Sequence, residues 1–207
     1  MSLGLNNNTV QISDTGDINA NGNIAHKYEY KDEYVASDYL FPVGGAPPDL
    51  QNVTIGGIVT RMYGFDGGST TEWMANSFEI NHDADIVSLN AETVKLEWHV
   101  HFLPSTDDAG VVEWSLEYCY IPMNGDAIPQ ATKVASKTVA VNSILVHLLA
   151  SVELPKPASG YNIGDLIIFN VKRIPTGTDT YPADALFIKC ALHMPVNSAG
   201  SRQRYIK

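Results

Sequence analysis

Two stretches in the middle of the chain alternate apolar and polar residues with a period of two. In residues 94–102 the apolar side chains are Val94, Leu96, Trp98, Val100 and Phe102. In residues 112–120 they are Val112, Trp114, Leu116, Tyr118 and Tyr120. Successive side chains of a β-strand point to opposite faces, so the pattern predicts two strands that each bury one face. The turn-forming segment 104–110 between them predicts a wide hairpin loop.

The remaining core-like segments also favour strands. Further strands are expected at 53–65, 77–80, 85–89, 132–141, 165–174 and 185–194, the last with one face formed by Leu186, Ile188, Cys190, Leu192 and Met194. Residues 143–154 also match a helical spacing, and we favour a strand because β-branched and aromatic residues surround them. Short strands without alternating helices predict an all-β fold, an antiparallel jelly-roll β-sandwich with an extended N-terminal arm.

The N-terminal thirty or so residues are rich in Asn, Gly, Asp and Ser and carry a six-residue period. Isoleucine recurs at Ile12, Ile18 and Ile24, with Gly16 and Gly22 between them. Such a period suits short strands joined by tight turns, as in fibre segments. One copy cannot bury three isoleucines, so we expect an arm that packs against copies of itself or docks on a larger assembly. The alternative is a flexible polar tail.

These segments give an expected domain organisation. Residues 1–35 form the anchoring or oligomerisation arm, and residues 36–52 form a Pro/Gly-rich linker. Residues 53–207 form the jelly-roll domain, which ends in a basic C-terminal tail.

Charge and cysteine usage exclude several classes of function. The chain has 13 Lys and Arg against 23 Asp and Glu, a net charge of -10, which argues against a nucleic-acid partner. No run of about 18 apolar residues and no signal-peptide pattern is present, so we expect neither a membrane span nor secretion. Cys119 and Cys190 lack metal-finger or redox spacing, which fits a chain kept in a reducing cytosol.

His99 and His101 provide the best enzymatic lead, because alternate residues of one strand project to the same face and two imidazoles there could share a metal. Cupins begin their metal motif with such a pair, but the Glu that should follow four or five residues later is missing. A third ligand could come from His193 or Glu117. The alternative, which we favour, is a solvated sheet face of cross-strand polar partners.

Other kinds of catalytic site have even less support. The sequence has no GxSxG nucleophile motif and no phosphate-binding glycine loop, and Glu113 with Glu117 is a weak candidate for a carboxylate pair. We therefore predict a non-enzymatic protein with no catalytic, cofactor-binding or metal-binding residues and no cofactor. Tyr63, Phe65 and Trp73 bracket the loop 66–72 and could stack on a sugar or partner, although we favour the edge of the core.

Three features together resemble a known family. They are Trp98-His99-Val100-His101, the strand Val112-Glu113-Trp114-Ser115-Leu116-Glu117-Tyr118, and the terminal Gly200-Ser201-Arg202-Gln203-Arg204-Tyr205-Ile206-Lys207. This combination, over residues 94–207, resembles small jelly-roll virion structural proteins of tailed bacteriophages. The segment 15–24 separately looks like the start of phage fibre and tailspike proteins. The resemblance implies a homotrimer outside the particle, as a head decoration (cement) protein, head fibre or tail fibre.

The same resemblance implies partners and a location. The partners would be major capsid or tail proteins, with assembly in the host cytoplasm and residence in the virion. Arg202, Arg204 and Lys207 form a candidate docking patch in an otherwise acidic chain, or else a solubilising tail. A binding module for a host-surface glycan or receptor is the alternative function, with the loops 66–72, 104–110, 123–129 and 175–182 as its surface. A cupin-like metalloenzyme is a third.

Overall fold

The two strands with the clearest alternation lie in different sheets and face each other across the core. β9 (Leu96–Pro104) and β10 (Gly110–Ile121) bury the faces that the sequence predicts, including Trp98 and Trp114. The computed structural model describes residues 2–5, 8–12, 18–21, 29–36, 41–42, 47–68, 72–124, 133–141, 143–174 and 178–196. The expectation of a hairpin between β9 and β10 is wrong, because their connection crosses from one sheet to the other. Alternation predicts which face is buried and leaves the pairing partner open.

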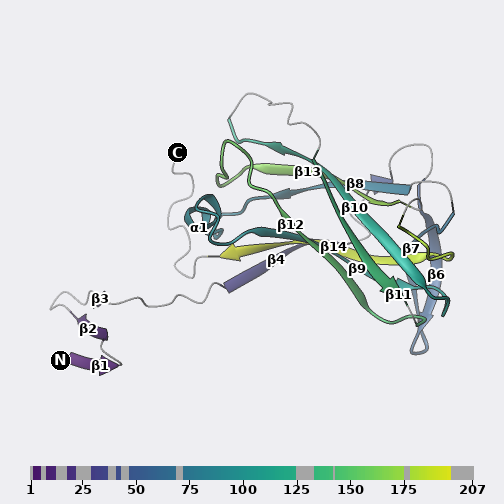
Figure 1. Ribbon diagram of the computed structural model, residues 1–207, viewed down its shortest axis with the longest axis horizontal. Helices are drawn as coiled ribbons and strands as arrows, with labels where there is room; N and C mark the ends of the chain where they lie inside the picture. Colours follow the sequence, from purple (N-terminus) through teal and green to yellow (C-terminus); the bar gives the residue numbers. More distant parts are fainter. Residues whose placement is uncertain are drawn as a thin grey trace.

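The strand order is that of a jelly roll, and the predicted fold class is confirmed. One sheet has the order β12-β9-β14-β7-β6 and the other β11-β10-β13-β8-β5, so consecutive strands repeatedly change sheet. The pairings are antiparallel, and the two sheets enclose the core (Figure 1). The remaining strands of the sandwich are β5 (Phe41–Pro42), β6 (Asp49–Ile55), β7 (Ile58–Phe65), β8 (Glu72–Glu79), β11 (Lys133–Val141), β12 (Leu148–Leu154), β13 (Leu166–Arg173) and β14 (Ala185–Val196).

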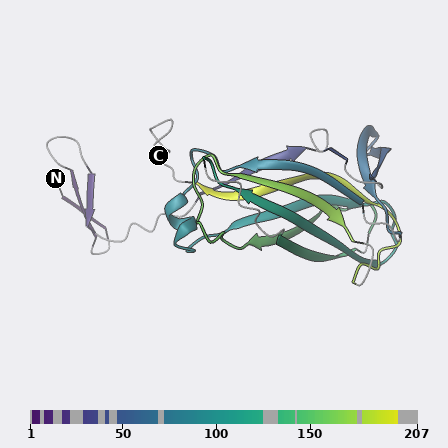
Figure 2. The same ribbon diagram turned by 90° about the horizontal axis from the view of Figure 1, so that it is seen from above.

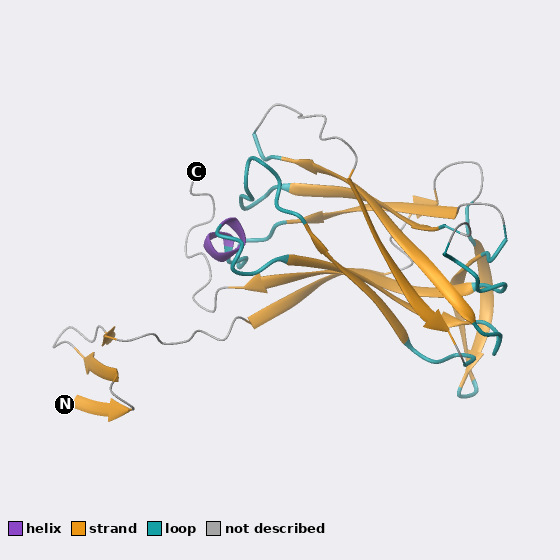
Figure 3. Ribbon diagram, viewed as in Figure 1, coloured by secondary structure: helices purple, strands orange, loops and turns teal. Residues whose placement is uncertain are grey.

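The segment expected as a strand at 85–89 is instead the short helix α1 (Ile86–Asn90), shown in Figure 3. The Asp85 carboxylate accepts a hydrogen bond from the Ser88 backbone N–H at 3.1 Å, which caps the first turn. Leu89 enters the core while Val87 is exposed. One turn of helix is too short to produce a readable period, so the sequence signal was ambiguous. No helix in the described part of the chain has the length and apolarity needed to cross a membrane.

The single strand expected at 53–65 is a hairpin of β6 and β7. Gly56 and Gly57 form its two-residue turn with φ of +57° and +84°, the left-handed conformation that a tight hairpin turn requires. Residues 143–154 contain the favoured strand only from Leu148 onward, as β12. Leu145, at φ +53°, lies in the turn before it.

A β-bulge divides the face predicted for 185–194. The register of β14 against β9 shifts between Phe187 and Lys189. Cys190, Leu192 and Met194 enter the main core as predicted, whereas Leu186 and Ile188 lie in a second apolar cluster with Val53 and Leu103. The extra residue of a bulge reverses the inward side of the strand, and sequence alternation alone does not locate it.

Two further segments bear on the expected domain boundaries. β4 (Glu29–Ala36) pairs with β14, so the boundary expected between residues 35 and 36 falls inside a strand of the sandwich. β6 begins at Asp49, within the expected linker. β1 (Ser2–Leu5), β2 (Asn8–Ile12) and β3 (Ile18–Asn21) form an antiparallel sheet of their own.

Candidate functional site

An apolar surface lies at one end of the sandwich. The β6–β7 hairpin stands at the end opposite α1 (Figures 1 and 2), and its tip residues Ile58 and Val59 are 72% and 68% exposed. The loop before β12 lies at the same end, because Leu145 packs in one cluster with Ile55 of the hairpin. We define the hairpin-end patch as the exposed apolar residues Ile58, Val59, Ile144, Val146 and Leu149. Exposed apolar side chains that gather at one end of a domain are candidates for a protein–protein contact.

Acidic side chains gather at the base of this hairpin. Glu72, at the start of β8, accepts a hydrogen bond from the Asp66 backbone N–H at 2.6 Å. Asp184 accepts one from the amide of Gln51 on β6. Burial raises the pKa of Glu72 to about 7, opposed by the Asp66 N–H and reinforced by the negative charges of Asp66, Asp184 and Asp49. In the folded state Glu72 therefore holds its proton at mildly acidic pH, where a glutamate with the ordinary pKa of 4.5 is ionised.

Glu72 predicts a definite pH dependence of stability. Its folded-state pKa of about 7 exceeds its ordinary value of 4.5, so the folded chain binds this proton more tightly than the unfolded chain. That contribution is fully present below pH 4.5 and is lost as the pH rises through 7. We expect Glu72→Gln to flatten the decline of the unfolding free energy across this window, measured by urea denaturation at a series of pH values. Glu153→Gln, at an exposed carboxylate, is the control, and equal slopes in both variants would contradict the assignment.

The sequence-predicted anchor residues are placed only in part. The Cα atoms of Ile12 and Ile18 are direct partners in the pairing of β2 with β3, so two isoleucines of the six-residue period lie at matching positions on paired strands. Ile24 and the docking candidates Arg202, Arg204 and Lys207 lie outside the described residues. The anchoring and docking roles stay predictions.

Two of the three aromatic residues around the loop 66–72, Tyr63 and Phe65, belong to the core as favoured, and Trp73 does not. Phe65 is fully buried, and Tyr63 packs against the main cluster. Trp73 is half-buried, and the Lys172 ammonium lies 4.2 Å from its ring centroid. Lys172 also forms an ion pair with Glu117, one of the two carboxylates considered as a catalytic pair. Glu113, the other, accepts a hydrogen bond from Thr178.

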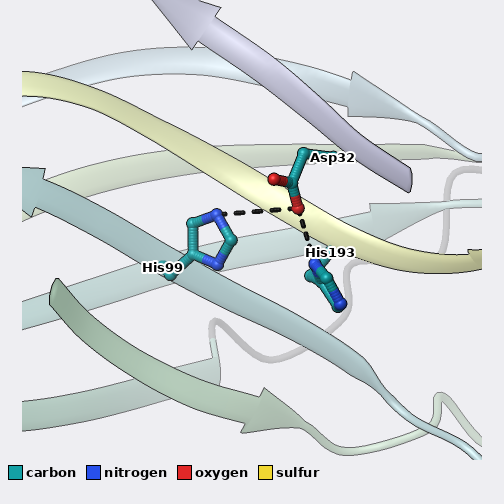
Figure 4. Close-up of side chains that lie close together, drawn as sticks. All are labelled: Asp32, His99 and His193. Atoms are coloured by element: carbon teal, nitrogen blue, oxygen red, sulfur yellow. Dashed lines mark hydrogen bonds and ion pairs between the residues drawn. The ribbon is translucent and has the colours of Figure 1, made fainter. Parts of the chain in front are cut away.

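A cluster of Asp32, His99 and His193 lies on the outer face of the other sheet, where three strands bring together residues distant in sequence (Figure 4). Asp32 comes from β4, His99 from β9 and His193 from β14. His193 Nδ1 is 2.6 Å from Asp32 Oδ1, and His99 Nε2 is 3.8 Å from the same oxygen. Tyr30 stacks on the His193 ring at 4.4 Å between centroids. His193 was one of the two third-ligand candidates beside His99, and Glu117 lies in the opposite sheet.

His101 does not join this cluster. Its Nδ1 lies 2.7 Å from Nε2 of His147, and the two rings stack. Burial lowers the pKa of His101 to about 4, and the neighbouring positive charges of His99 and Lys189 act in the same direction. Burial also lowers the pKa of His99, which is only 7% exposed. The favoured interpretation of a solvated polar face is therefore wrong for His99.

The pairing of His99 with Asp32 was beyond sequence reasoning. Asp32 was assigned to the arm, and its position depends on the pairing of β4 with β14, in which Asp32 and His193 are direct cross-strand partners. The signal for the cluster is a carboxylate and an imidazole at matching register positions of two paired strands. Reading it requires knowing that β4 belongs to the sheet.

Comparisons with known proteins give a distant structural likeness. No protein-family model matches the sequence, and the search of curated proteins finds no match. Among solved structures, the chain is similar to the CBM36-1 domain of a multidomain xylanase from the hindgut metagenome of Trinervitermes trinervoides. The likeness has 9% identity and a TM-score of 0.41, and it covers 78% of this chain and 96% of that domain. At this distance it carries no argument about function, and the jelly-roll assignment rests on the strand order.

Proposed function

We propose that this chain is a non-enzymatic structural protein of a tailed-bacteriophage particle, a homotrimeric decoration or fibre protein on the particle surface. The observation that carries the proposal is the hairpin-end patch. Ile58 and Val59 stand at the tip of a two-stranded ribbon, where they are 72% and 68% exposed. Such a ribbon has little stability of its own, and a partner that covers its apolar tip would stabilise it.

The occupant that we propose for this patch is a second copy of the chain. Each copy carries a projecting hairpin and, at the same end of the sandwich, the segment that leads into β12, with the exposed apolar residues Ile144, Val146 and Leu149. A contact between the hairpin of one copy and this segment of the next uses two different surfaces, and it forms a closed ring when the rotation between successive copies is one third of a turn. Three copies is the number that the family resemblance implies.

Attachment to the particle is assigned to the N-terminal segment. Because β4 is part of the sandwich sheet, the anchoring segment ends before Glu29. The partners would be capsid or tail proteins in a virion assembled in the host cytoplasm. Arg202, Arg204 and Lys207 would add a basic contact to an acidic neighbour.

The test is the solution mass of the full chain and of the double variant Ile58→Asp with Val59→Asp. We expect a trimer for the full chain and a monomer for the variant, because two carboxylates at the tip would have to be desolvated in the contact. Light scattering on a sizing column measures both masses. Val87→Asp is the matched control, since Val87 is an apolar residue, 80% exposed, on α1 at the opposite end of the sandwich. It should stay trimeric.

Two outcomes would contradict the proposal. A full chain that is monomeric at all concentrations would remove the assembly role, and specific binding on a glycan array would then favour the glycan-binding alternative. A double variant that stays trimeric while its thermal unfolding is unchanged would show that the hairpin-end patch is not the contact.

A further inference from the structure

The cluster of Asp32, His99 and His193 has the composition of a metal site. It offers one carboxylate oxygen and two imidazole nitrogens, and these three atoms lie within 4.8 Å of one another. The ligands come from three strands whose places in the sheet are fixed by backbone pairing: β4 pairs with β14, and β14 pairs with β9. Ligands carried by paired strands are held in place before an ion arrives.

The hydrogen bonds within the cluster leave one buried atom without a partner. His193 and Asp32 already satisfy each other at 2.6 Å. Nε2 of His99 is buried and makes no hydrogen bond within the described part of the chain, and it points towards Asp32 Oδ1 at 3.8 Å. Figure 4 shows the Asp32 carboxylate between the two imidazole rings. An unpaired buried polar atom is costly, and a cation bound to Nε2 would remove that cost.

The distances suit a small cation better than a direct contact. Zinc lies about 2.0–2.2 Å from nitrogen and oxygen ligands, so two ligands of a tetrahedral ion are roughly 3.4 Å apart. The gap between His99 Nε2 and Asp32 Oδ1 is 3.8 Å, longer than a hydrogen bond and close to that ligand separation. The shorter distance of Asp32 to His193 would lengthen when the ion replaces the shared proton. His193 and Asp32 are partly exposed, with side-chain exposures of 32% and 24%, which leaves a path for the ion and a water ligand.

We propose that Asp32, His99 and His193 bind a divalent metal ion such as zinc, with water completing the coordination. Two imidazoles and one carboxylate suit zinc and its neighbours in the transition series, and they disfavour calcium, which takes six or more oxygen ligands. This assignment departs from the expectation of no metal-binding residue, and it does not depend on the proposed assembly role.

The ion would join β4 to the centre of the sheet. β4 is bound to the sandwich by its pairing with β14, at one edge of that strand. A metal that also engages His99 on β9 ties three adjacent strands together. Metal binding to the folded state adds to its stability in proportion to the affinity, so the root of the N-terminal segment would be held more firmly when zinc is present.

The test is zinc binding to the full chain, purified without a histidine tag and treated with a chelator. Isothermal titration calorimetry with zinc alone should give one ion per chain, and thermal melting should shift upward on zinc addition. His193→Gln and Asp32→Asn should each weaken binding at least about tenfold, because each removes one of three protein ligands. His147→Asn is the control: His147 is an exposed histidine that contacts His101 and contributes no ligand to the cluster.

A separate readout guards against unfolded variants. The zinc-free melting temperatures of the variants and the control show whether each chain is folded, and His99→Gln serves if either of the other variants is not. Absence of zinc binding to the folded full chain would overturn the proposal. Binding that His147→Asn abolishes and His193→Gln leaves intact would also overturn it, by moving the ligands to the His101–His147 pair. Calcium titrated in the same way should give no heat, and calcium binding equal to zinc would contradict the ligand chemistry.

Discussion

Replacing Arg173 by methionine should lower the free energy of unfolding by about 3–5 kcal/mol, because it leaves the Asp179 carboxylate buried and unpaired. Arg173 is fully buried on β13, and its Nε and Nη2 each lie 2.9 Å from an oxygen of Asp179. Its guanidinium also donates to the backbone carbonyls of Phe65, Tyr181 and Ala183. One side chain thus joins the end of β7, β13 and the segment before β14.

The matched control for this prediction is Lys95→Met. Lys95 forms an ion pair with Glu153 at 2.7 Å, but the two side chains are 48% and 64% exposed. Solvent screens both charges of an exposed pair, so the control should unfold near the unaltered chain in urea. Equal destabilisation by the two substitutions would show that burial of the Arg173–Asp179 pair does not govern its contribution.

Arg173 also connects stability to the proposed contact surface. It donates to the carbonyl of Phe65, the last residue of β7, at 2.7 Å. β7 is one of the two strands of the hairpin that carries Ile58 and Val59. The hydrogen bonds of Arg173 therefore fix the base from which the hairpin projects. The orientation of the hairpin-end patch thus depends on Arg173, a residue in the interior of the sandwich.

The parts of the fold that the sequence predicted are those governed by local alternation. β9 and β10 have their apolar faces where the pattern placed them, since each strand needs only the rule that successive side chains change sides. The jelly roll followed from many such strands without intervening helices. The pair Gly56-Gly57 is a hairpin signal within residues 53–65. The apolar residues on both sides of it made the segment resemble one continuous strand.

The parts that were missed depend on pairing between distant segments. The bulge between Phe187 and Lys189 is defined only against β9, so no pattern within β14 reveals it. α1 begins at the cap formed by Asp85. In the sequence, the apolar residues next to Asp85 resembled a short strand, and that resemblance concealed the cap signal. The cluster of Asp32, His99 and His193 forms only because β4 lies beside β14, and this pairing joins residues more than 150 positions apart in the sequence. Long-range register is information that one sequence does not display.

The centre of the core is organised around Trp114, which joins the two sheets. Trp114 lies on β10, and its ring contacts Phe65 at 5.0 Å, Phe102 at 5.5 Å and Phe187 at 6.0 Å between centroids. Those three residues belong to β7, β9 and β14 of the opposite sheet. Its indole N–H is buried and has no hydrogen-bond partner among the described residues. Trp114 therefore stabilises the folded state through packing, and the desolvation of its indole N–H offsets part of that gain.

Trp114→Ala should destabilise the protein by about 3–5 kcal/mol, because the cavity left by the indole touches both sheets. Trp114→Phe should cost much less, since it keeps an aromatic ring in the cluster and removes the unpaired N–H. Urea denaturation measures both, and Trp73→Ala, at a half-buried tryptophan beneath Lys172, is the control with an expected loss of about 1 kcal/mol. If Trp114→Phe proved as destabilising as Trp114→Ala, the indole N–H would have a partner in the folded chain, and the core would depend on that hydrogen bond as well as on packing.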